Sequence, residues 1–579
     1  MEFFKRGGRY LAVYGLLTLG LLDTALAQTQ PAAPRLPLRS GEPDVRVHTL
    51  EGNRPVLPRS GPAVPPGHES FAPSGAEQIR FKLHNIDVKG ATVYSPEELQ
   101  TVFSSRYGTV VSLAEIYVLA GEIQRRYRDA GYFLSQVIVP PQRIVGGRMY
   151  VEVLEGYIDS VVIEGAVGPV ERLIKGYLEH VTMERPLRLS TLERGLLLAN
   201  DLPGIEAKGV LQASEAAVGA SQLVVIAGRK RFDGLVLLDN LGSTFTGQWE
   251  VAVRAGTNSF TRFGENIGIT GLVSDPDKGF GGNRKNQRVG MLTSSLRIGD
   301  RGTYLSGFLS YGDSNPGDFL SEFDYDSTKL LANLKVVHPI IRTRSHNLFV
   351  EGGFDFIDSK TDIFGNLSFI EDHLRVLSLA VAYDFRDPWG GSTYLNLGVR
   401  QGLSGFGSTD AGDPMASRFD ADGKFTSMQL TASRLQTLTD TLALYALVKA
   451  QYAFDPVLAD EEFNLGSIDF GRGYDPKELS GDDGIGTTLE LQYTRSSPWS
   501  FLERYQLFGF YDFGAVRQKS NHLLPSSESS LASSGVGLRT WLTRGLSLEL
   551  QVAKPLTRRS QRADDSKDPE FLLRAIARF

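Results

Sequence analysis

The sequence predicts a membrane β-barrel of 16 antiparallel strands, preceded by two small α+β modules. Beyond Arg229 the helical signal stops, and apolar and polar residues alternate with the two-residue period of a strand. The gaps between these strands are alternately short and long after a short first turn. Short turns at one end, long loops at the other and an even strand number are typical of outer-membrane barrels.

The predicted barrel, residues 230–579, is built from strands whose two faces differ in polarity. In one of them Leu395, Leu397 and Val399 share a face, opposite Asn396. A soluble β-sandwich is the alternative, but it needs a second apolar core and does not explain the alternating gaps. The expected strands are 231–240, 247–258, 263–274, 286–298, 301–312, 327–338, 345–357, 373–386, 391–402, 424–434, 441–454, 484–496, 502–515, 530–540, 544–552 and 571–579.

Aromatic residues mark the expected membrane boundary and the end of the chain. Phe571, Leu573 and Phe579 share one face of the last strand, which resembles the C-terminal signal by which bacterial barrels are recognised for insertion. Any edge strand can end in phenylalanine, so the signal gains its weight from the strands before it. We expect contact with outer-membrane lipid and insertion by the barrel-assembly machinery. Three tryptophans lie at or beside short turns, as an inner aromatic girdle requires: Trp389, Trp499 and Trp541.

The first residues predict export from the cytoplasm. Lys5, Arg6 and Arg9 precede an apolar run at 10–22, and small residues follow at Ala25-Leu26-Ala27. This order predicts a signal peptide over residues 1–27. A membrane anchor is the alternative, although the apolar run is short for a spanning helix.

Composition narrows the function further. The chain of 579 residues has no cysteine, which excludes disulfides, thiolate catalysis and cysteine-based metal sites. A formal charge of −6 argues against nucleic acid as a partner. Residues 28–77 are rich in proline, which predicts an extended periplasmic linker because proline disrupts helix and sheet alike.

Two modules with the order strand, helix, helix, strand, strand are expected at 78–155 and 156–229, and they indicate a tandem repeat. Their helices have predicted starts. Capping boxes are expected at Ser95 with Glu98, at Ser112 with Glu115 and at Ser190 with Glu193. Gly131 is expected to end the longest helix.

The most distinctive segment is the predicted sixth outer loop, residues 455–483, which we call loop six. It contains Arg472 between Gly471 and Gly473, followed by Tyr474. In the strand at 502–515, Phe510, Asp512 and Gly514 share a face, and a carboxylate cannot cheaply face lipid. If loop six folds inward, Arg472 and Asp512 can form a bidentate pair. The alternative is a solvated loop cation and an ordinary pore-lining acid.

These features together resemble the outer-membrane transporters of two-partner secretion, which include the haemolysin and filamentous-haemagglutinin secretion/activation proteins. The modules of that family are called POTRA domains. Considered alone, the module and barrel-entrance motifs are also compatible with ordinary turns. The motifs that carry the resemblance are Asn200-Asp201-Leu202-Pro203-Gly204, Asp239-Asn240-Leu241-Gly242, Arg472-Gly473-Tyr474 and Phe510-x-Asp512-x-Gly514.

The resemblance implies that Arg472 packs against Asp512 inside the barrel and that secretion requires this pair. It implies a secreted exoprotein as partner, captured in the periplasm, and a monomer or weak oligomer in the outer membrane. Two features depart from the family: Gly471 stands where valine is frequent, and the prolines of 28–77 disfavour a plug helix.

Other functions fit the sequence less well. A barrel-assembly insertase of the same superfamily usually has more modules, and a diffusion porin has none. A barrel enzyme is disfavoured because the eight histidines show no ligand spacing and no nucleophile–base arrangement is evident. No nucleotide-binding loop is present either. The sequence therefore predicts a protein-translocating pore without catalytic residues, metal or cofactor.

Overall fold

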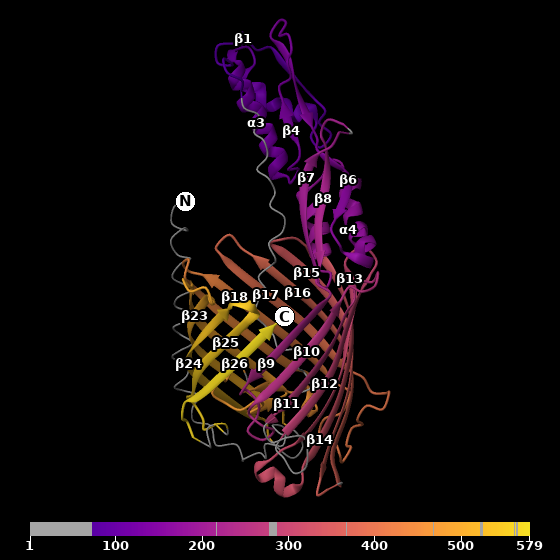
Figure 1. Ribbon diagram of the computed structural model, residues 1–579, viewed down its shortest axis with the longest axis vertical. Helices are drawn as coiled ribbons and strands as arrows, with labels where there is room; N and C mark the ends of the chain where they lie inside the picture. Colours follow the sequence, from indigo (N-terminus) through magenta and orange to yellow (C-terminus); the bar gives the residue numbers. More distant parts are fainter. Residues whose placement is uncertain are drawn as a thin grey trace. The chain divides into compact units, whose positions relative to one another are not determined.

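The computed structural model describes residues 72–215, 217–276, 286–365, 367–466, 468–520, 525–560, 562 and 566–579. The predicted signal peptide and nearly all of the predicted linker lie outside these residues. The described chain forms two α+β modules and a closed barrel (Figure 1).

The first module is a three-stranded sheet, of order β2-β5-β4, packed against a long helix. Helix α3 begins with the capping box expected at Ser112 and Glu115, and its apolar stripe is buried at Ile116, Ile123 and Tyr127. Its elements are β1 (Arg80–Lys82), β2 (Asn85–Lys89), α2 (Pro96–Gln100), η3 (Thr101–Arg106), β3 (Val110–Ser112), α3 (Leu113–Asp129), β4 (Gln136–Ile138) and β5 (Arg148–Leu154).

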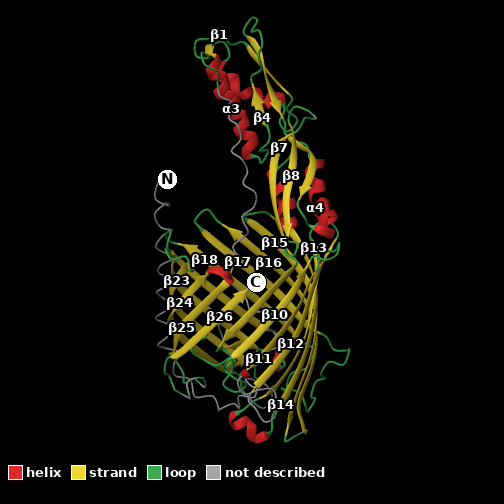
Figure 2. Ribbon diagram, in the orientation of Figure 1, coloured by secondary structure: helices red, strands yellow, loops and turns green. Residues whose placement is uncertain are grey.

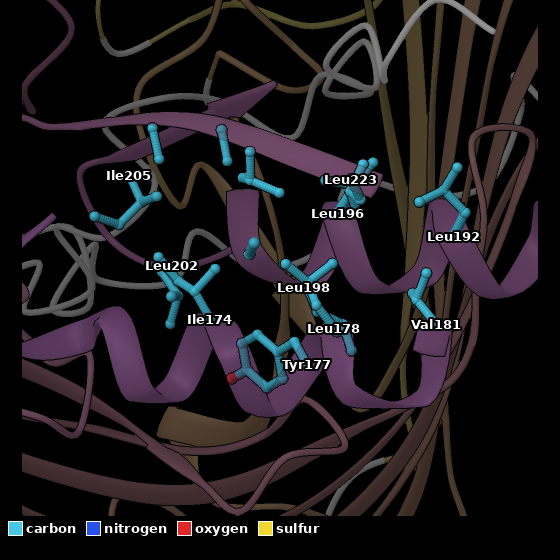
Figure 3. Close-up of a cluster of buried hydrophobic side chains, with 14 of the residues drawn as sticks. Ile174, Tyr177, Leu178, Val181, Leu192, Leu196, Leu198, Leu202, Ile205 and Leu223 are labelled. Atoms are coloured by element: carbon cyan, nitrogen blue, oxygen red, sulfur yellow. The ribbon is translucent and has the colours of Figure 1, made fainter. Parts of the chain in front are cut away.

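The second module repeats this topology with the sheet order β6-β8-β7. Its core lies between the sheet and two helices, where Ile174, Leu178, Leu196 and Leu223 pack together (Figure 3). Its elements are β6 (Tyr157–Glu164), η4 (Gly168–Val170), α4 (Glu171–Met183), α5 (Leu189–Asn200), β7 (Ile205–Ala213) and β8 (Ala220–Arg229). In each three-stranded sheet the strand that comes first in the chain pairs in parallel with the last, β2 with β5 and β6 with β8.

One predicted helix start is wrong. Helix α5 begins at Leu189, so Ser190 lies inside its first turn and does not cap it. Arg188 occupies the N-cap position without a side-chain hydrogen bond. Glu193, expected to complete a capping box, instead pairs with Arg344 at 3.1 Å. A tertiary ion pair therefore replaces the local cap.

The barrel has 16 antiparallel strands, which confirms the predicted fold. Figure 2 shows the wall as tilted strands throughout, and Figure 1 shows β26 beside β9, where the barrel closes. The strands are β9 (Phe232–Asp239), β10 (Glu250–Asn258), β11 (Asn266–Ser274), β12 (Asn286–Ile298), β13 (Thr303–Asn315), β14 (Asp326–Arg342), β15 (His346–Ile363), β16 (Leu367–Arg386), β17 (Gly391–Gly402), β18 (Thr426–Thr437), β19 (Leu442–Ala453), β22 (Asp483–Ser496), β23 (Leu502–Gln518), β24 (Ser527–Leu542), β25 (Leu546–Pro555) and β26 (Glu570–Arg578).

The strict alternation of short and long gaps fails at one position. A long loop was expected between the strands at 345–357 and 373–386, but β15 and β16 continue until only residues 364–366 separate them. Phe364 and Gly365 make this turn with positive φ angles of 52° and 89°. The extra pairs are mostly polar, so hydrophobic alternation could not reveal them.

Outward and inward faces of the wall differ as the sequence predicts. Leu397 and Leu379 are 58% and 60% exposed on the outer face, while Gln451 and Arg400 point inward. Trp389 and Trp499 lie exposed at short turns. Among the described residues, no helix combines the length and apolar character needed to cross a bilayer.

Candidate functional site: loop six and its attachments

Loop six connects β19 to β22 across residues 454–482 and folds into the barrel lumen. Leu465, Phe470 and Tyr474 are at most 3% exposed, and they pack with Leu447 and Val516 of the wall. A short hairpin, β20 (Phe463–Leu465) and β21 (Leu479–Gly481), stiffens the inward segment. The loop is therefore a folded part of the lumen.

Arg472 lies at the centre of this inward segment and binds Asp512 of β23. Its Nη2 and Nε donate to the two carboxylate oxygens of Asp512 at 2.8 and 3.0 Å, and its backbone N–H donates at 3.1 Å. The exposed fraction is 4% for Arg472 and 0% for Asp512. The structure thus brings the two residues together as a bidentate, desolvated pair.

The pair has further partners that the sequence did not indicate. Nη1 of Arg472 donates to Glu490 of β22 at 3.1 Å, and its guanidinium lies 3.4 Å from the ring centroid of Phe510. Glu490 is shared, because Arg539 Nη2 donates to it at 2.9 Å. Strand parity places Glu490 on the lumen face, but parity alone cannot say which lumen acids the loop reaches.

Asp512 accepts hydrogen bonds from several donors. Besides Arg472 it accepts from Thr488 Oγ1 at 2.5 Å and from Ser533 Oγ at 3.2 Å. A carboxylate in such surroundings remains stable only while its cation is present, because the neutral donors do not offset its full desolvation.

The glycines beside Arg472 let the loop approach the wall. Gly471 has φ of +81°, a conformation that valine rarely adopts, so this chain takes a path that requires glycine here. A Cβ on Gly473 would lie 2.9 Å from the backbone nitrogen of Pro555. A Cβ on Gly514 would lie 2.4 Å from Leu465 Cδ2. Tyr474 completes the contact by donating to the Ala532 carbonyl at 3.0 Å.

Loop six has a second attachment, which we call the stem. Glu461 accepts from Arg400 of β17 at 2.6 and 2.7 Å, and Arg400 also donates to Asp355 at 2.8 Å. Next to it, Asp460 pairs with Lys329 of β14. The stem contains no glycine or aromatic signature, so only its run of acids, Asp460 to Glu462, could have indicated it.

The barrel-entrance motif lies where the barrel closes. Asp239 is 1% exposed and accepts from Arg574 Nε of β26 at 3.2 Å. The Asn240 side chain bonds to β26 as well, through Leu573. Gly242 is required sterically, since a Cβ would meet the Gly247 carbonyl oxygen at 2.2 Å.

The module motif joins the second module to the short-turn end of the barrel. The Asn200 carboxamide closes the end of α5 by bonding to Leu196 and Ala207. Asp201 accepts from Arg342 at the end of β14, at 2.7 and 2.8 Å.

The end of the same motif meets the first short turn of the barrel. The Pro203 carbonyl accepts from Ser259 at 2.7 Å. Gly204 has φ of +71° and no room for a side chain, because a Cβ would lie 2.2 Å from the Lys230 carbonyl oxygen. The motif is therefore a junction between two domains as well as a turn.

The expected C-terminal signal residues share the outward face of β26. Phe571 and Phe579 are 74% and 67% exposed, and Leu573 lies between them. Their role in insertion stays a prediction. Among the described residues, no three His, Asp or Glu side chains are grouped so that they could hold a metal ion.

An even-stranded barrel with an inward-folded loop and repeated β-α-α-β-β modules defines a class of outer-membrane transporter. The chain belongs to the haemolysin secretion/activation protein ShlB/FhaC/HecB family, whose model matches residues 219–540. The ShlB-type POTRA domain matches residues 81–156. The resemblance stated from the sequence is confirmed, as is the location: the barrel lies in the outer membrane and the modules lie in the periplasm.

Relatives that align with nearly the whole chain agree with this assignment. The heme/hemopexin transporter protein HuxB of Haemophilus influenzae (strain 86-028NP) is 25% identical over 518 residues, which cover 87% of this chain and 88% of that protein. The hemolysin transporter protein HpmB of Proteus mirabilis is 24% identical over 529 residues, 85% of each chain. The structure of CdiB from Escherichia coli covers 95% of this chain and 100% of that chain with a TM-score of 0.74 at 21% identity, which supports the fold.

Proposed function

We propose that this protein translocates a specific partner exoprotein across the outer membrane. The periplasmic modules capture the unfolded exoprotein, and loop six controls its passage through the lumen. Folding of the exoprotein outside the cell gives the direction. The observation that supports this proposal most is the buried Arg472–Asp512 pair, which holds a large folded loop inside the barrel lumen.

Capture is supported by a groove beside the edge of the second module's sheet. Strand β6 pairs with β8 and lies at the edge of the sheet, where an added strand can find backbone partners. A cavity of about 360 Å³ lies between this edge and α4, lined by Val161, Lys175, Gly176 and Thr182 among others. An extended segment added to β6 can place alternate side chains there.

The loop is tested by export. We expect Arg472→Ala to abolish secretion of the partner exoprotein while the barrel still assembles. Arg472→Lys is the matched variant: it keeps the charge but not the fork, and we expect it to recover only part of the secretion. Secretion is measured by immunoblot of culture supernatant, and assembly by heat-modifiable migration of the barrel. Wild-type export by Arg472→Ala would show that the loop does not control passage.

Capture is tested by filling the groove. We expect Thr182→Trp, on the exposed side of α4, to lower co-purification of the partner with the full chain. Val118→Trp on α3 of the first module is the control, since Val118 is 62% exposed and lies away from this groove. Equal co-purification by the two variants would place capture elsewhere.

A further inference from the structure

The barrel closes through its shortest ladder. Strand β26 pairs with β9 over five positions, Arg574 to Arg578 with Asp239 to Leu235, whereas each flanking ladder has eight pairs. We call this ladder the seam. Because each pair contributes backbone hydrogen bonds, the seam is the weakest line along the wall.

Asn240 extends the seam with its side chain. Its Nδ2 donates to the Phe571 carbonyl at 2.8 Å, and its Oδ1 accepts from the Leu573 backbone N–H at 2.7 Å. Its own backbone N–H donates to the Leu573 carbonyl at 3.2 Å. The carboxamide therefore takes the place of the next peptide of β9 and fastens the outer end of the seam.

Loop six holds the turn that carries Asn240. Asp475, three residues after Arg472, is 0% exposed. Its carboxylate accepts from Ser243 Oγ at 2.7 Å and from the Thr244 backbone N–H at 3.0 Å, both in the first outer turn between β9 and β10. A buried carboxylate with these donors fixes the turn in one position.

A second residue joins the same three segments. Arg562 lies between β25 and β26, 6% exposed, with Nη1 3.6 Å from Asp475 Oδ1. The same nitrogen donates to the Gly242 carbonyl at 2.9 Å, and Nη2 donates to the carbonyl of Asn240. The segments on both sides of the seam are thus attached to Asp475 of loop six. The first outer turn is attached by hydrogen bonds, and the connection between β25 and β26 is attached by the Arg562 ion pair.

We propose that Asp475 is a positioning residue that couples the inward state of loop six to closure of the seam. When loop six leaves the lumen, Ser243, Thr244 and Arg562 lose their common acceptor. The first outer turn then keeps only its bonds to Arg562 and to the neighbouring outer segments, so Asn240 is held less firmly and the outer end of the seam separates. The pore widens by separation of β9 from β26. This rests on the proposed control of passage by loop six, but Asp475 can be tested without an exoprotein.

The test uses the absence of cysteine from the chain. Leu238 and Ala575 are register partners across the seam, and both belong to the outward face. Neighbouring strands place such pairs within the Cα range of about 4.4–6.8 Å that a disulfide needs. A Leu238→Cys/Ala575→Cys pair can therefore lock the seam when oxidised and release it when reduced.

We expect Asp475→Ala to raise the single-channel conductance of the purified full chain in planar bilayers several-fold. The oxidised seam pair is expected to return this conductance to the wild-type value, and a thiol reductant to restore the increase. The control pair is Leu379→Cys/Val399→Cys, register partners on β16 and β17, which is expected to leave the increase unchanged. A structural defect elsewhere would not respond to the seam disulfide alone.

Two outcomes overturn the coupling: wild-type conductance in Asp475→Ala, or an increase that survives the oxidised seam. Asn240→Ala is the second variant, because it weakens the seam without removing a loop-six residue. It should give the same disulfide-sensitive increase even if Asp475→Ala assembles poorly, and wild-type conductance there also overturns the proposal. Failure of the proposed function is a separate result, since it is read from export by Arg472→Ala.

Discussion

Two attachments of loop six, at Arg472 and at the stem, have opposite polarity. At Arg472 a single loop cation lies between two acids of the wall, Asp512 and Glu490. At the stem the loop supplies the acids, and Glu461 meets the wall cation Arg400. Both sets are nearly inaccessible to solvent, so salt screens them little. The difference is that at Arg472, the tip of the inward segment, one guanidinium serves both wall acids, while the stem divides its ion pairs among several residues.

This difference predicts how the loop leaves. A shared attachment can lose one pair and keep the rest, so the stem can act as a hinge. The Arg472 ion pairs have no such reserve, because the same guanidinium serves both acids. We therefore expect the tip to set whether the lumen is closed, and the stem to set how far and how fast the loop moves.

Exchange of charges at the tip should have the largest effect. Arg472→Asp gathers three acids in one buried site, and Asp512→Arg sets two cations together. Each single variant should lose about 3–5 kcal/mol of loop attachment and all export.

The double exchange, Arg472→Asp with Asp512→Arg, should recover loop attachment and export only in part. Recovery is incomplete because Glu490 and the backbone N–H of residue 472 favour a cation at 472 and an acid at 512. A double-mutant cycle on loop protection from protease measures the coupling. No coupling between the two positions would contradict direct pairing.

The second prediction concerns the close approach at the tip. Gly473→Ala must displace the backbone of β25, because its Cβ would lie 2.9 Å from the Pro555 nitrogen. We expect a cost of about 1–3 kcal/mol and a more protease-sensitive loop with the charges unchanged. Gly290→Ala on β12 is the control, since nothing lies within 4 Å of the added methyl there. Equal sensitivity in both variants would show that the charges alone hold the tip.

The tip could be read from the sequence and the stem could not, for a physical reason. A cation between glycines, followed by tyrosine, is a local signal. The cost of a carboxylate facing lipid placed Asp512 in the lumen, and the family resemblance paired it with Arg472. Asp460 and Glu461 depend on Lys329 and Arg400, which are distant along the chain and resemble many other lumen charges. Their pairing is set by how far the loop folds inward.

The barrel itself was predictable because membrane and lumen impose a strong period of two along every strand. The continuation of β15 and β16 toward their connecting turn was not predictable, because the added pairs are mostly polar and carry no such period. The role of Asn240 was also hidden, since Asp-Asn-Leu-Gly is compatible with an ordinary turn. Its bonds to Leu573 and Phe571 depend on the barrel being closed.

The third prediction tests the stem by a milder change. Glu461→Gln removes one charge, but Arg400 keeps Asp355 at 2.8 Å and the amide can still accept one bond. We expect a loss of about 1 kcal/mol and slower export, with the pore still closed. Export kinetics and bilayer conductance measured together separate the two sites. An open pore in Glu461→Gln would mean that the stem, too, closes the lumen.

The smallest effect is expected at a half-buried carboxylate outside the lumen that neutral donors hold. In the first module, Glu155 accepts from the Thr92 and Val93 backbone N–H groups at 2.7 and 3.0 Å and from Tyr127 Oη at 2.7 Å. Burial acts to raise the pKa of Glu155, but the hydrogen bonds, those from Thr92 foremost, hold it below its usual value.

A carboxylate with a lowered pKa stabilises the folded module fully above the ordinary glutamate pKa of about 4.3, and this contribution is lost as the pH falls through the lower folded value. Residues 78–229 contain both module cores, so their thermal unfolding can be followed by circular dichroism. The wild-type midpoint should fall below about pH 4, and Glu155→Gln should be slightly less stable at pH 7 with a flatter acid limb. Because this carboxylate has no cation to lose, its neutralisation should leave pore conductance unchanged, whereas neutralisation of Asp512 strands Arg472. An open pore in Glu155→Gln would contradict this contrast between a carboxylate held by neutral donors and Asp512, which is paired with a cation.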